Sequence, residues 1–328
     1  MIVPFDGKIR PAGSLGRVHF IGIGGAGMSG IARIMRSRGI AVSGSDAKDS
    51  PVLAELASIG AEVFAVHDAA HLGAADTVVV STAIRESNPE YLAALDRGLL
   101  ILPRAAALAA VMAGRRSVAV AGTHGKTTTT AMLAVALRAA GADPSFVIGG
   151  SLLAGGEAAY DGTGELFVAE ADESDGSFLL YTPDAAIVTN VEPDHLDHYG
   201  TAEAVTKAFI EFADRIQPDG FLVTCVDDAG ARALAESARS RGVRVWGYGE
   251  SADADVRITA VSPDQTGWAF TLTLPGRAPL RARVPEPKRH DVANAAAALT
   301  VGLGLGLPAD GLVAGLAAFS GTKRRFEL

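Results

Sequence analysis

Short apolar runs alternate with amphipathic segments along the first third of the chain. Residues 18–23 form an apolar run, a glycine-rich turn follows, and residues 28–38 repeat apolar positions at helical spacing up to Gly39. The same alternation of strand and helix signals continues at residues 40–43, 53–59, 62–66 and 77–81. It is typical of strand–helix–strand units and predicts an α/β domain built on a parallel, doubly wound sheet.

A second alternating series begins after a polar break. Residues 104–112 predict one more helix, residues 114–116 interrupt the pattern, and residues 117–121 predict a new strand. We therefore divide the chain into a first domain at residues 1–112 and a second domain at residues 113–322. Strand signals in the second domain lie at residues 166–169, 185–189, 221–225 and 243–246, and helix signals lie at residues 128–140 and 202–216.

The pattern changes towards the end of the chain. Residues 256–261, 268–274 and 280–284 predict short strands separated by turns, which we expect to form a small antiparallel edge. Residues 290–304 and 309–319 predict two closing helices. The predicted fold class is therefore two α/β domains in series, of which the second is mostly parallel with an antiparallel edge.

Composition and charge narrow the class of protein. The 328 residues are 48% hydrophobic and 20% charged, and the net charge of -8 argues against a general nucleic-acid binder. The single cysteine, Cys225, lies in an apolar run and predicts a buried thiol. No apolar run approaches the roughly 20 residues that a membrane span needs. We therefore expect a cytoplasmic protein that does not insert into a membrane.

The strand at residues 117–121 leads into a phosphate-binding loop. The loop and the start of the next helix read Gly122-Thr123-His124-Gly125-Lys126-Thr127-Thr128. Glycines let backbone N–H groups approach phosphate oxygens, and the helix N-terminus adds a favourable dipole. Lys126 can reach the terminal phosphates, and the Thr127 hydroxyl can bind Mg²⁺. This is a shortened form of the common motif, and the flanking strand and helix favour an ATP–Mg²⁺ site.

Candidate metal ligands follow two further strands of the second domain. Glu170 ends the apolar run at residues 166–169, and Mg²⁺ needs one or two carboxylates beside the phosphates. Some of the acids at residues 172–175 can instead form a solvated loop. Asn190 and His195 follow another strand, where a histidine can hold a second metal or order a phosphate. Because parallel strands end at the same sheet edge, we expect these groups to meet there.

The turn at residues 22–27 matches the pattern G-x-G-x-x-G, and Asp46 follows the second predicted strand. The motif fits a nicotinamide or flavin dinucleotide with Asp46 on a ribose. It fits equally any ligand that carries a pyrophosphate. The motif alone leaves both interpretations open.

Six segments together resemble the Mur ligase family. They lie at residues 19–30, 121–129, 170–178, 190–197, 289–294 and 323–327. The resemblance covers nearly the whole chain and is to the branch that joins L-alanine to UDP-N-acetylmuramate in peptidoglycan synthesis. It implies that the carboxylate of the sugar nucleotide takes the γ-phosphate of ATP, and that the amine of L-alanine then displaces phosphate from the acyl phosphate.

The resemblance implies a role for each residue around the phosphates. Lys126 would contact the β- and γ-phosphates, and Thr127 and Glu170 would hold a first Mg²⁺. His195 would help to hold a second Mg²⁺, and Asn190 would line the same edge. Mn²⁺ could replace Mg²⁺ in this scheme.

The resemblance also implies contacts to the adenine and to the sugar nucleotide. Asn294 would bind adenine with His290 near the base, and Arg325 would contact the nucleotide from a hinge. The resemblance implies that the first domain is a Rossmann-like domain that binds the UDP-sugar, with His67 on the uridine side. Its substrate candidates are Gly24, Gly25, Ala26, Gly27, Met28, Asp46, His67, Ser81, Thr82 and Arg104.

The chain departs from the family pattern in three places. No lysine stands in the register where later-acting Mur ligases carry a carbamylated one, which falls at about Phe209, and Asp291 replaces the usual asparagine of a secondary adenine contact. A third domain of roughly 100–150 residues would begin after the hinge at residues 323–328. We therefore expect a two-domain piece or a shortened protein that binds UDP-N-acetylmuramate, turns over poorly and forms at most a weak homodimer.

Three other functions compete with this interpretation. A murein-peptide-recycling ligase would add a preformed peptide to the same sugar nucleotide. A Mur-like module could bind nucleotides without catalysis, although Glu170 and His195 are intact. The interpretation as a nicotinamide oxidoreductase depends on residues 22–27 alone and gives the phosphate loop no role.

Overall fold

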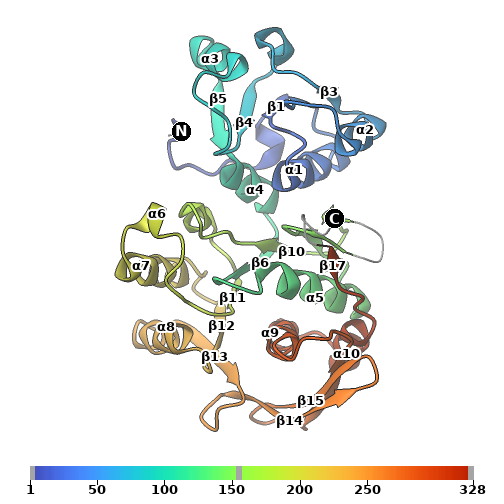
Figure 1. Cartoon of the computed structure of the whole chain (residues 1–328), viewed down its shortest axis with the longest axis vertical. Coiled ribbons are helices and arrows are strands. Elements are labelled where there is room, and N and C mark those ends of the chain that lie inside the picture. Colours follow the sequence, from blue (N-terminus) through green and yellow to red (C-terminus); the bar gives the residue numbers. More distant parts are fainter. Residues whose placement is uncertain (1–3, 153–156, 324–328) are drawn as a thin grey trace. The chain divides into compact units, whose positions relative to one another are not determined.

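The computed structural model describes residues 4–152 and 157–323, and its internal contacts divide the chain into two compact units. The first unit comprises Met1–Arg115 and Ala158–Asp161, and the second comprises Arg116–Glu157 and Gly162–Leu328 (Figure 1). Each unit has its own sheet. We describe them separately because each carries its own glycine-rich loop.

The first unit is built on a five-stranded parallel sheet with the strand order β3-β2-β1-β4-β5 (Figure 1). Its strands are β1 (Val18–Ile21), β2 (Val42–Ser45), β3 (Glu62–Phe64), β4 (Thr77–Val80) and β5 (Leu100–Pro103). Its helices are α1 (Ala26–Ser37), α2 (Pro51–Ser58), α3 (Pro89–Asp96) and α4 (Arg104–Met112), with a short 3₁₀ turn η2 (Ala69–Leu72). The order reverses between β1 and β4, where α/β sheets of this kind bind ligands.

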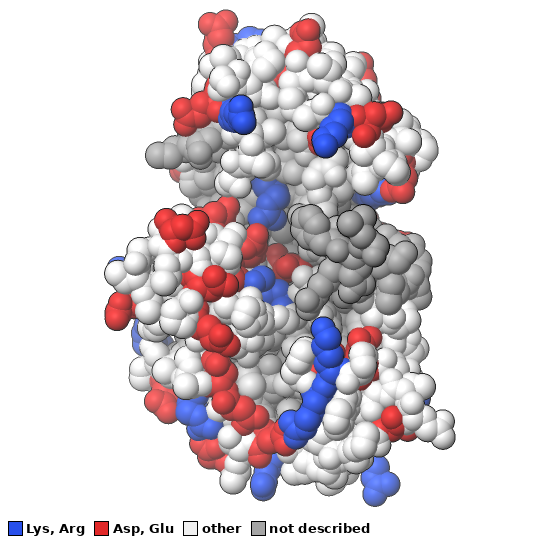
Figure 2. Space-filling view, viewed as in Figure 1, with Lys and Arg blue, Asp and Glu red and all other residues white. Residues whose placement is uncertain are grey.

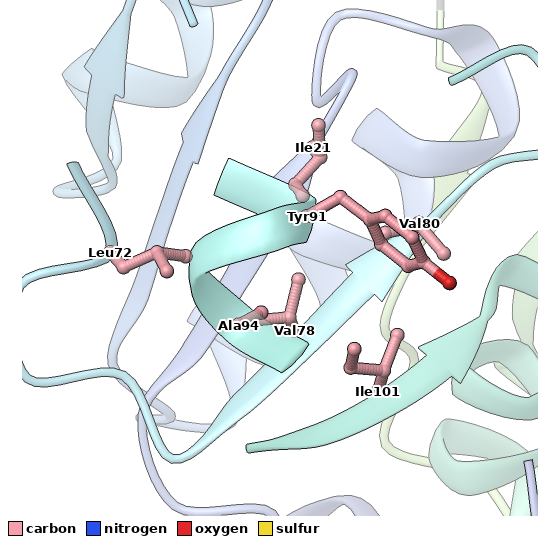
Figure 3. Packing of buried hydrophobic residues seen from close by; sticks show 7 residues of the cluster. All are labelled: Ile21, Leu72, Val78, Val80, Tyr91, Ala94 and Ile101. Atoms are coloured by element: carbon pink, nitrogen blue, oxygen red, sulfur yellow. The ribbon is translucent and has the colours of Figure 1, made fainter. Parts of the chain in front are cut away.

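Local sequence explains why these helices begin where they do. The Asn88 side chain accepts hydrogen bonds from the backbone N–H groups of Glu90 and Tyr91, and Pro89 takes the first helical position of α3. Tyr91 then packs into an apolar cluster with residues of β1, β4 and β5 (Figure 3). Each fully buried aliphatic side chain in such a cluster contributes about 1.5–3 kcal/mol. This packing fixes α3, and therefore Glu90, against the sheet.

The second unit is built on sheet strands that follow one another in the order β16-β15-β14-β13-β12-β11-β6-β10-β7. Its central strands are parallel, whereas β14, β15 and β16 pair antiparallel. The strands of the parallel part are β6 (Arg116–Ala121), β7 (Ser145–Val147), β10 (Leu166–Glu170), β11 (Ala185–Val188), β12 (Phe221–Cys225) and β13 (Arg244–Gly249). The others are β14 (Val256–Asp264), β15 (Gly267–Thr273) and β16 (Leu280–Val284). The short strand β9 (Ala159–Tyr160) belongs to the first unit.

Helices of the second unit pack around this sheet (Figure 1). They are α5 (Lys126–Ala139), α6 (Leu196–Tyr199), α7 (Ala202–Ala213), α8 (Ala229–Ser240), α9 (Asp291–Gly304) and α10 (Ala309–Ala317). A short pair, β8 (Ser151–Leu152) and β17 (Thr322–Lys323), forms a separate two-stranded sheet. Helix α5 is central, because it contacts α9, α10 and β10. The phosphate loop therefore opens a helix that is held on several sides.

The predicted fold class is confirmed, including the antiparallel edge. Two elements of the first unit, α3 and β5, were not predicted, and neither was β7 of the second. Helices α1 and α5 also begin two residues earlier than predicted, directly at Ala26 and Lys126. Cys225 is buried, as its apolar run predicts. Within the described ranges no helix is long and apolar enough to cross a membrane.

Charged side chains are mixed on the face seen in Figure 2, where many acidic residues lie among the basic ones. The net charge of the chain is -8. A continuous basic surface, which a phosphate backbone would need, does not occur on the described part of that face.

Candidate active site

The glycine loop of the first unit lies at the carboxyl end of β1 and is supported from β2. The backbone N–H groups of Gly22 and Ile23 donate to the Ser45 carbonyl at 2.8 and 2.9 Å. The Gly24 N–H donates to Asp46 Oδ2 at 2.9 Å. A Cβ on Gly24 would lie 2.8 Å from the same carboxylate oxygen. Asp46 therefore holds the loop in place, a role in addition to the substrate contact that the sequence predicts.

Other predicted substrate residues of the first unit surround the same loop. A Cβ on Gly27 would lie 3.1 Å from the Arg104 side chain, so Arg104 lies over the first turn of α1. A Cβ on Gly22 would lie 3.9 Å from the Ser81 hydroxyl. Thr82 follows as an exposed residue. The Met28 side chain is buried in the core, so Met28 can offer a ligand only its backbone.

The phosphate loop of the second unit connects β6 to α5. Gly122 has φ 130° and Gly125 has φ 84°, both in the left-handed region that favours glycine. A Cβ on Gly122 would lie 2.1 Å from the Thr189 hydroxyl, and one on Gly125 would lie 2.8 Å from Asn294 Oδ1. The loop therefore requires glycine at both positions. It also lies directly against Thr189, which follows β11, and Asn294 of α9.

Asn190 fixes the conformation of the loop. Its Oδ1 accepts from the His124 backbone N–H at 2.8 Å, and its Nδ2 donates to the His124 carbonyl at 3.1 Å. The Thr189 hydroxyl donates to the same carbonyl at 2.6 Å. Asn190 was predicted as a catalytic candidate, but both ends of its amide are used to hold the loop. Thr189 was not predicted, although its position directly after a strand was the available signal.

Lys126 begins α5, and its ammonium points back into the loop. Its Nζ donates to the Gly122 carbonyl at 2.7 Å and to the Thr123 carbonyl at 3.3 Å. It also forms an ion pair of 2.8 Å with Glu173, whose side chain is only 2% exposed. Burial raises the pKa of the Glu173 carboxyl above its usual range, against the opposing effect of Lys126. These contacts fix the ammonium against the backbone of the loop.

Glu173 is the main site residue that the sequence did not single out. It lies in the acidic segment at residues 172–175, part of which could have been a solvated loop. Its Oε1 is 3.7 Å from His195 Nε2, and its Oε2 is buried without a hydrogen-bond partner among the described residues. The Tyr199 hydroxyl donates to the Glu173 carbonyl at 2.5 Å. A buried carboxylate beside the loop lysine is therefore part of the site.

The two predicted ligands of the first metal lie together. The Thr127 hydroxyl donates to Glu170 Oε1 at 3.2 Å, and the Gly149 N–H donates to Glu170 Oε2 at 2.8 Å. A hydroxyl and a carboxylate form an oxygen donor set that suits Mg²⁺. Within residues 4–152 and 157–323 no three His, Cys, Asp or Glu side chains form a metal-binding group. Magnesium does not require one, because phosphate oxygens and water complete its coordination.

His195 lies close to Glu173. It has φ 52°, occupies the N-cap position of α6 without a side-chain cap hydrogen bond, and its side chain is 34% exposed. Its Nε2 lies near Glu173 and 3.9 Å from Asp194 Oδ2. The structure thus brings His195 close to Lys126 through Glu173, and the described contacts do not join it to Glu170.

The predicted adenine residues are found at the start of α9. Asn294 is buried, and its Nδ2 donates to Asp291 Oδ1 at 2.9 Å. Its Oδ1 consequently faces Gly125 of the phosphate loop. His290 precedes the helix with a 68% exposed side chain. Arg325 lies outside the described residues.

The loop geometry gives a direct test of the Gly122 position. Replacing Gly122 by alanine should lower the free energy of unfolding by more than the about 1–2 kcal/mol of left-handed strain alone, because its Cβ would meet Thr189. Nucleotide binding should be lost with it. The matched control is Gly141→Ala, which has φ 83° and nothing within 4 Å of its Cβ. Equal unfolding curves for the two variants, measured in urea, would contradict this account of the loop.

Two family models match the chain in the same order as its units. Residues 17–116 match the model "Mur ligase family, catalytic domain", and residues 120–302 match the model "Mur ligase middle domain". Together they cover well over half of the chain. The chain belongs to the Mur ligase family.

Similar proteins narrow the position within the family. The chain is 57% identical to the UDP-N-acetylmuramate–L-alanine ligase of a Nocardioides species over 327 residues, covering 100% of this chain and 68% of that protein. It is 56% identical to the enzyme of the same name from Kineococcus radiotolerans, covering 100% of this chain and 70% of that protein. The chain thus spans about two thirds of the length of these curated relatives.

Solved structures show the same fold. The UDP-N-acetylmuramate–alanine ligase of Thermotoga maritima matches with a TM-score of 0.82 at 29% identity, covering 94% of this chain and 70% of that one. The UDP-N-acetylmuramate:L-alanyl-γ-D-glutamyl-meso-diaminopimelate ligase of Neisseria meningitides matches with a TM-score of 0.83 at 28% identity, covering 95% of this chain and 100% of that one. Fold similarity alone therefore does not separate the two kinds of ligase.

Proposed function

We propose that this chain carries the nucleotide sites of an ATP-dependent ligase that joins L-alanine to UDP-N-acetylmuramate in cytoplasmic peptidoglycan synthesis. The carrying observation is the convergence of Lys126, Thr127 and Glu170 at one edge of the second sheet. The identity of 57% to an enzyme of that name supports the choice of substrates.

The proposed reaction overcomes the poor reactivity of a carboxylate. A carboxylate oxygen attacks the γ-phosphorus of ATP, the bond to the β-phosphate oxygen breaks, and ADP leaves. The product is an acyl phosphate. The amine of L-alanine then attacks the acyl carbon, a proton is lost from the nitrogen, and inorganic phosphate leaves. Both steps depend mainly on positioning the reactants and neutralising phosphate charge.

The phosphate loop performs the positioning in this proposal. Gly122, Thr123, His124 and Gly125 would surround the phosphates, while Lys126 neutralises the terminal ones and Thr128 extends the first helical turn. The Lys126 ammonium needs little reorientation, because Glu173 and two loop carbonyls already hold it there. Preorganised charge of this kind stabilises a transition state more than a mobile side chain does.

Thr127 and Glu170 would hold a first Mg²⁺, and His195 would help to hold a second, with Mn²⁺ able to replace either ion. The chemistry that these residues would gain from the ions is positive charge beside the transferring phosphate. The hydroxyl–carboxylate pair at 3.2 Å supports the first of these assignments. For the base, Asn294 Oδ1 would accept from the adenine amino group beside His290, with Arg325 as a further nucleotide contact.

The first unit would bind the sugar nucleotide. Its glycine loop and the N-terminus of α1, from Gly24 to Met28, would face the diphosphate. Arg104 lies over the same turn and would add a positive charge, and Ser81 and Thr82 would add hydroxyls at the edge. Asp46 and His67 would lie towards the ribose and the base.

The weak homodimer of this chain also stays a prediction.

A murein-peptide ligase is the second candidate, because the Neisseria structure of that class matches as well as the alanine ligase does. An activity assay can separate the two ligases. It uses a protein that has the full length of the relatives, and it compares L-alanine with the tripeptide L-alanyl-γ-D-glutamyl-meso-diaminopimelate as the substrate. Phosphate release that requires L-alanine would support our proposal. Release with the tripeptide only would favour the alternative.

Binding of the sugar nucleotide tests the proposal on the chain itself. Calorimetry should show one site for UDP-N-acetylmuramate, and the affinity should fall about 10-fold or more in Arg104→Ala, because hydrogen bonds to charged groups are among the stronger ones. The control is Arg85→Ala, at an exposed position of the same unit. Absence of heat with UDP-N-acetylmuramate, in a folded sample, would reject the substrate assignment.

A further inference from the structure

A buried carboxylate surrounded by three histidines lies in the first unit, outside the groups described above. Glu90 of α3 is completely buried, and no lysine or arginine pairs with it among the described contacts. His67 Nδ1 and His71 Nδ1 lie 3.3 and 3.4 Å from its oxygens, and His19 Nε2 lies at 3.7 Å. Burying a carboxylate is costly unless it is paired or hydrogen-bonded. The cluster therefore calls for a physical explanation.

The cluster does not have the geometry of a metal site, because no such group is found within the described residues. Two of its histidines make further contacts, while His19 Nε2 and His71 Nδ1 are buried without a hydrogen-bond partner among the described residues. His19 Nδ1 lies 2.8 Å from the Ser43 hydroxyl, and the His71 ring stacks on Phe64 with centroids 3.8 Å apart. His67 differs from His19, because 20% of its side chain is exposed.

The direction of the Ser45 hydrogen bond determines which nitrogen of His67 carries a proton. The Ser45 hydroxyl donates its single proton to Glu90 Oε2. Burial alone would raise the pKa of Glu90, but the neighbouring His19 and the Ser45 hydrogen bond outweigh it and lower the pKa, so Glu90 is an ionised acceptor. His67 Nδ1 therefore faces two acceptors, Ser45 Oγ at 2.8 Å and Glu90 Oε2. In a neutral ring Nδ1 must carry the proton, and Nε2 is left as an acceptor.

His67 is placed where a ligand of the glycine loop can reach it. Ser45 ends β2, and its carbonyl accepts from Gly22 and Ile23 of the loop. The side chain of the next residue, Asp46, accepts a hydrogen bond from the Gly24 N–H. None of the described hydrogen bonds joins Asp46 to the histidine cluster. His67 follows the adjacent strand β3 at the same carboxyl edge. The described contacts leave its Nε2 without a hydrogen-bond partner.

Resting on the proposed UDP-sugar site, we propose that Glu90 acts through its own contact with His67 and through Ser45 as a positioning residue that makes His67 Nε2 an acceptor for the N3–H group of uracil. Uracil has a donor at N3, whereas cytosine has an acceptor there. An acceptor on the protein therefore pairs with uracil and repels cytosine. The buried carboxylate determines the base selectivity without touching the nucleotide.

Calorimetry with UDP and CDP on the whole chain, at about pH 8 where an ordinary histidine is neutral, tests this. The wild type should prefer UDP. Glu90→Gln can donate to Ser45 and reverse the relay, so the ratio of the two dissociation constants should fall about 10- to 100-fold. Ser45→Ala keeps the direct contact of 3.3 Å between His67 Nδ1 and Glu90 Oε2, so it should lower the ratio less than Glu90→Gln does. The control is Glu62→Gln, an equal charge change at an exposed position of β3.

A loss of fold would weaken the binding of UDP and CDP equally, because they share the diphosphate. The ratio of their dissociation constants therefore reports only on the base. Nitrogen NMR of the wild type, with His67 assigned by the variant His67→Gln, gives an independent measurement. It should find Nδ1 protonated and Nε2 bare, with Nε2 shifting on addition of UDP. A protonated Nε2 in the neutral ring, or an unchanged ratio in Glu90→Gln, would overturn the inference alone. A wild type that binds neither nucleotide would reject the proposed UDP-sugar function as well.

Discussion

Replacing Lys126 by methionine should slow ATP-dependent phosphorylation of the sugar nucleotide by about a hundred- to a thousandfold. The ammonium lies 2.7 Å from the Gly122 carbonyl and is paired with the buried Glu173, so it is fixed before any phosphate arrives. Methionine preserves the length of the side chain and removes the charge. The rate of ADP formation in a coupled assay, at saturating substrates, measures the loss as a change in kcat.

The control for this variant is Lys207→Met, because Lys207 has a 77% exposed side chain and a simple ion pair with Glu211 on the same helix. It removes the same charge far from the loop. If Lys126→Met kept more than about a tenth of the wild-type kcat, the assignment of Lys126 to the transferring phosphate would be wrong.

Replacing Glu170 by glutamine should have an effect of similar size, with a different signature. The variant keeps the shape of the side chain and a carbonyl oxygen for Gly149, but it loses the negative charge beside the Thr127 hydroxyl. Metal binding depends on that charge, so we expect kcat to fall about a hundredfold and the Mg²⁺ concentration for half-maximal rate to rise.

A titration of the rate with Mg²⁺ and Mn²⁺ measures both changes. The matched control is Glu165→Gln, which makes the same replacement at an exposed position just before β10. An unchanged Mg²⁺ requirement in Glu170→Gln, together with a reduced kcat, would mean that Glu170 supports the loop and does not hold the metal.

Much of the second unit's site could be predicted because its residues directly follow strands. Glu170 ends β10 and Lys126 follows β6, and the parallel register brings both to one edge. Glu173 could not be separated from its acidic neighbours, because sequence gives no measure of burial at a single loop position. The same holds for Asn190, whose amide is used by the His124 backbone. Its spacing predicts its location but not its hydrogen-bond partners.

The first unit shows a stronger limit of sequence reasoning. The helix that carries Glu90 was not predicted, because α3 is only eight residues long, from Pro89 to Asp96, and the segment lacks a long apolar repeat. The signal that could have found it is Asn88 followed by Pro89, a typical helix start. Glu90 meets Ser45 and His67 only through the fold, since 45 and 23 residues separate it from them.

This chain should activate the carboxylate of UDP-N-acetylmuramate with ATP. Hydroxylamine can show this activation, because it traps an acyl phosphate without needing the amino-acid site. The chain is incubated with ATP, Mg²⁺, UDP-N-acetylmuramate and hydroxylamine, and ADP and hydroxamate are quantified. We expect equal amounts of the two, dependent on the sugar nucleotide and abolished in Lys126→Met. ADP without hydroxamate, or no product although both nucleotides bind, would contradict the account.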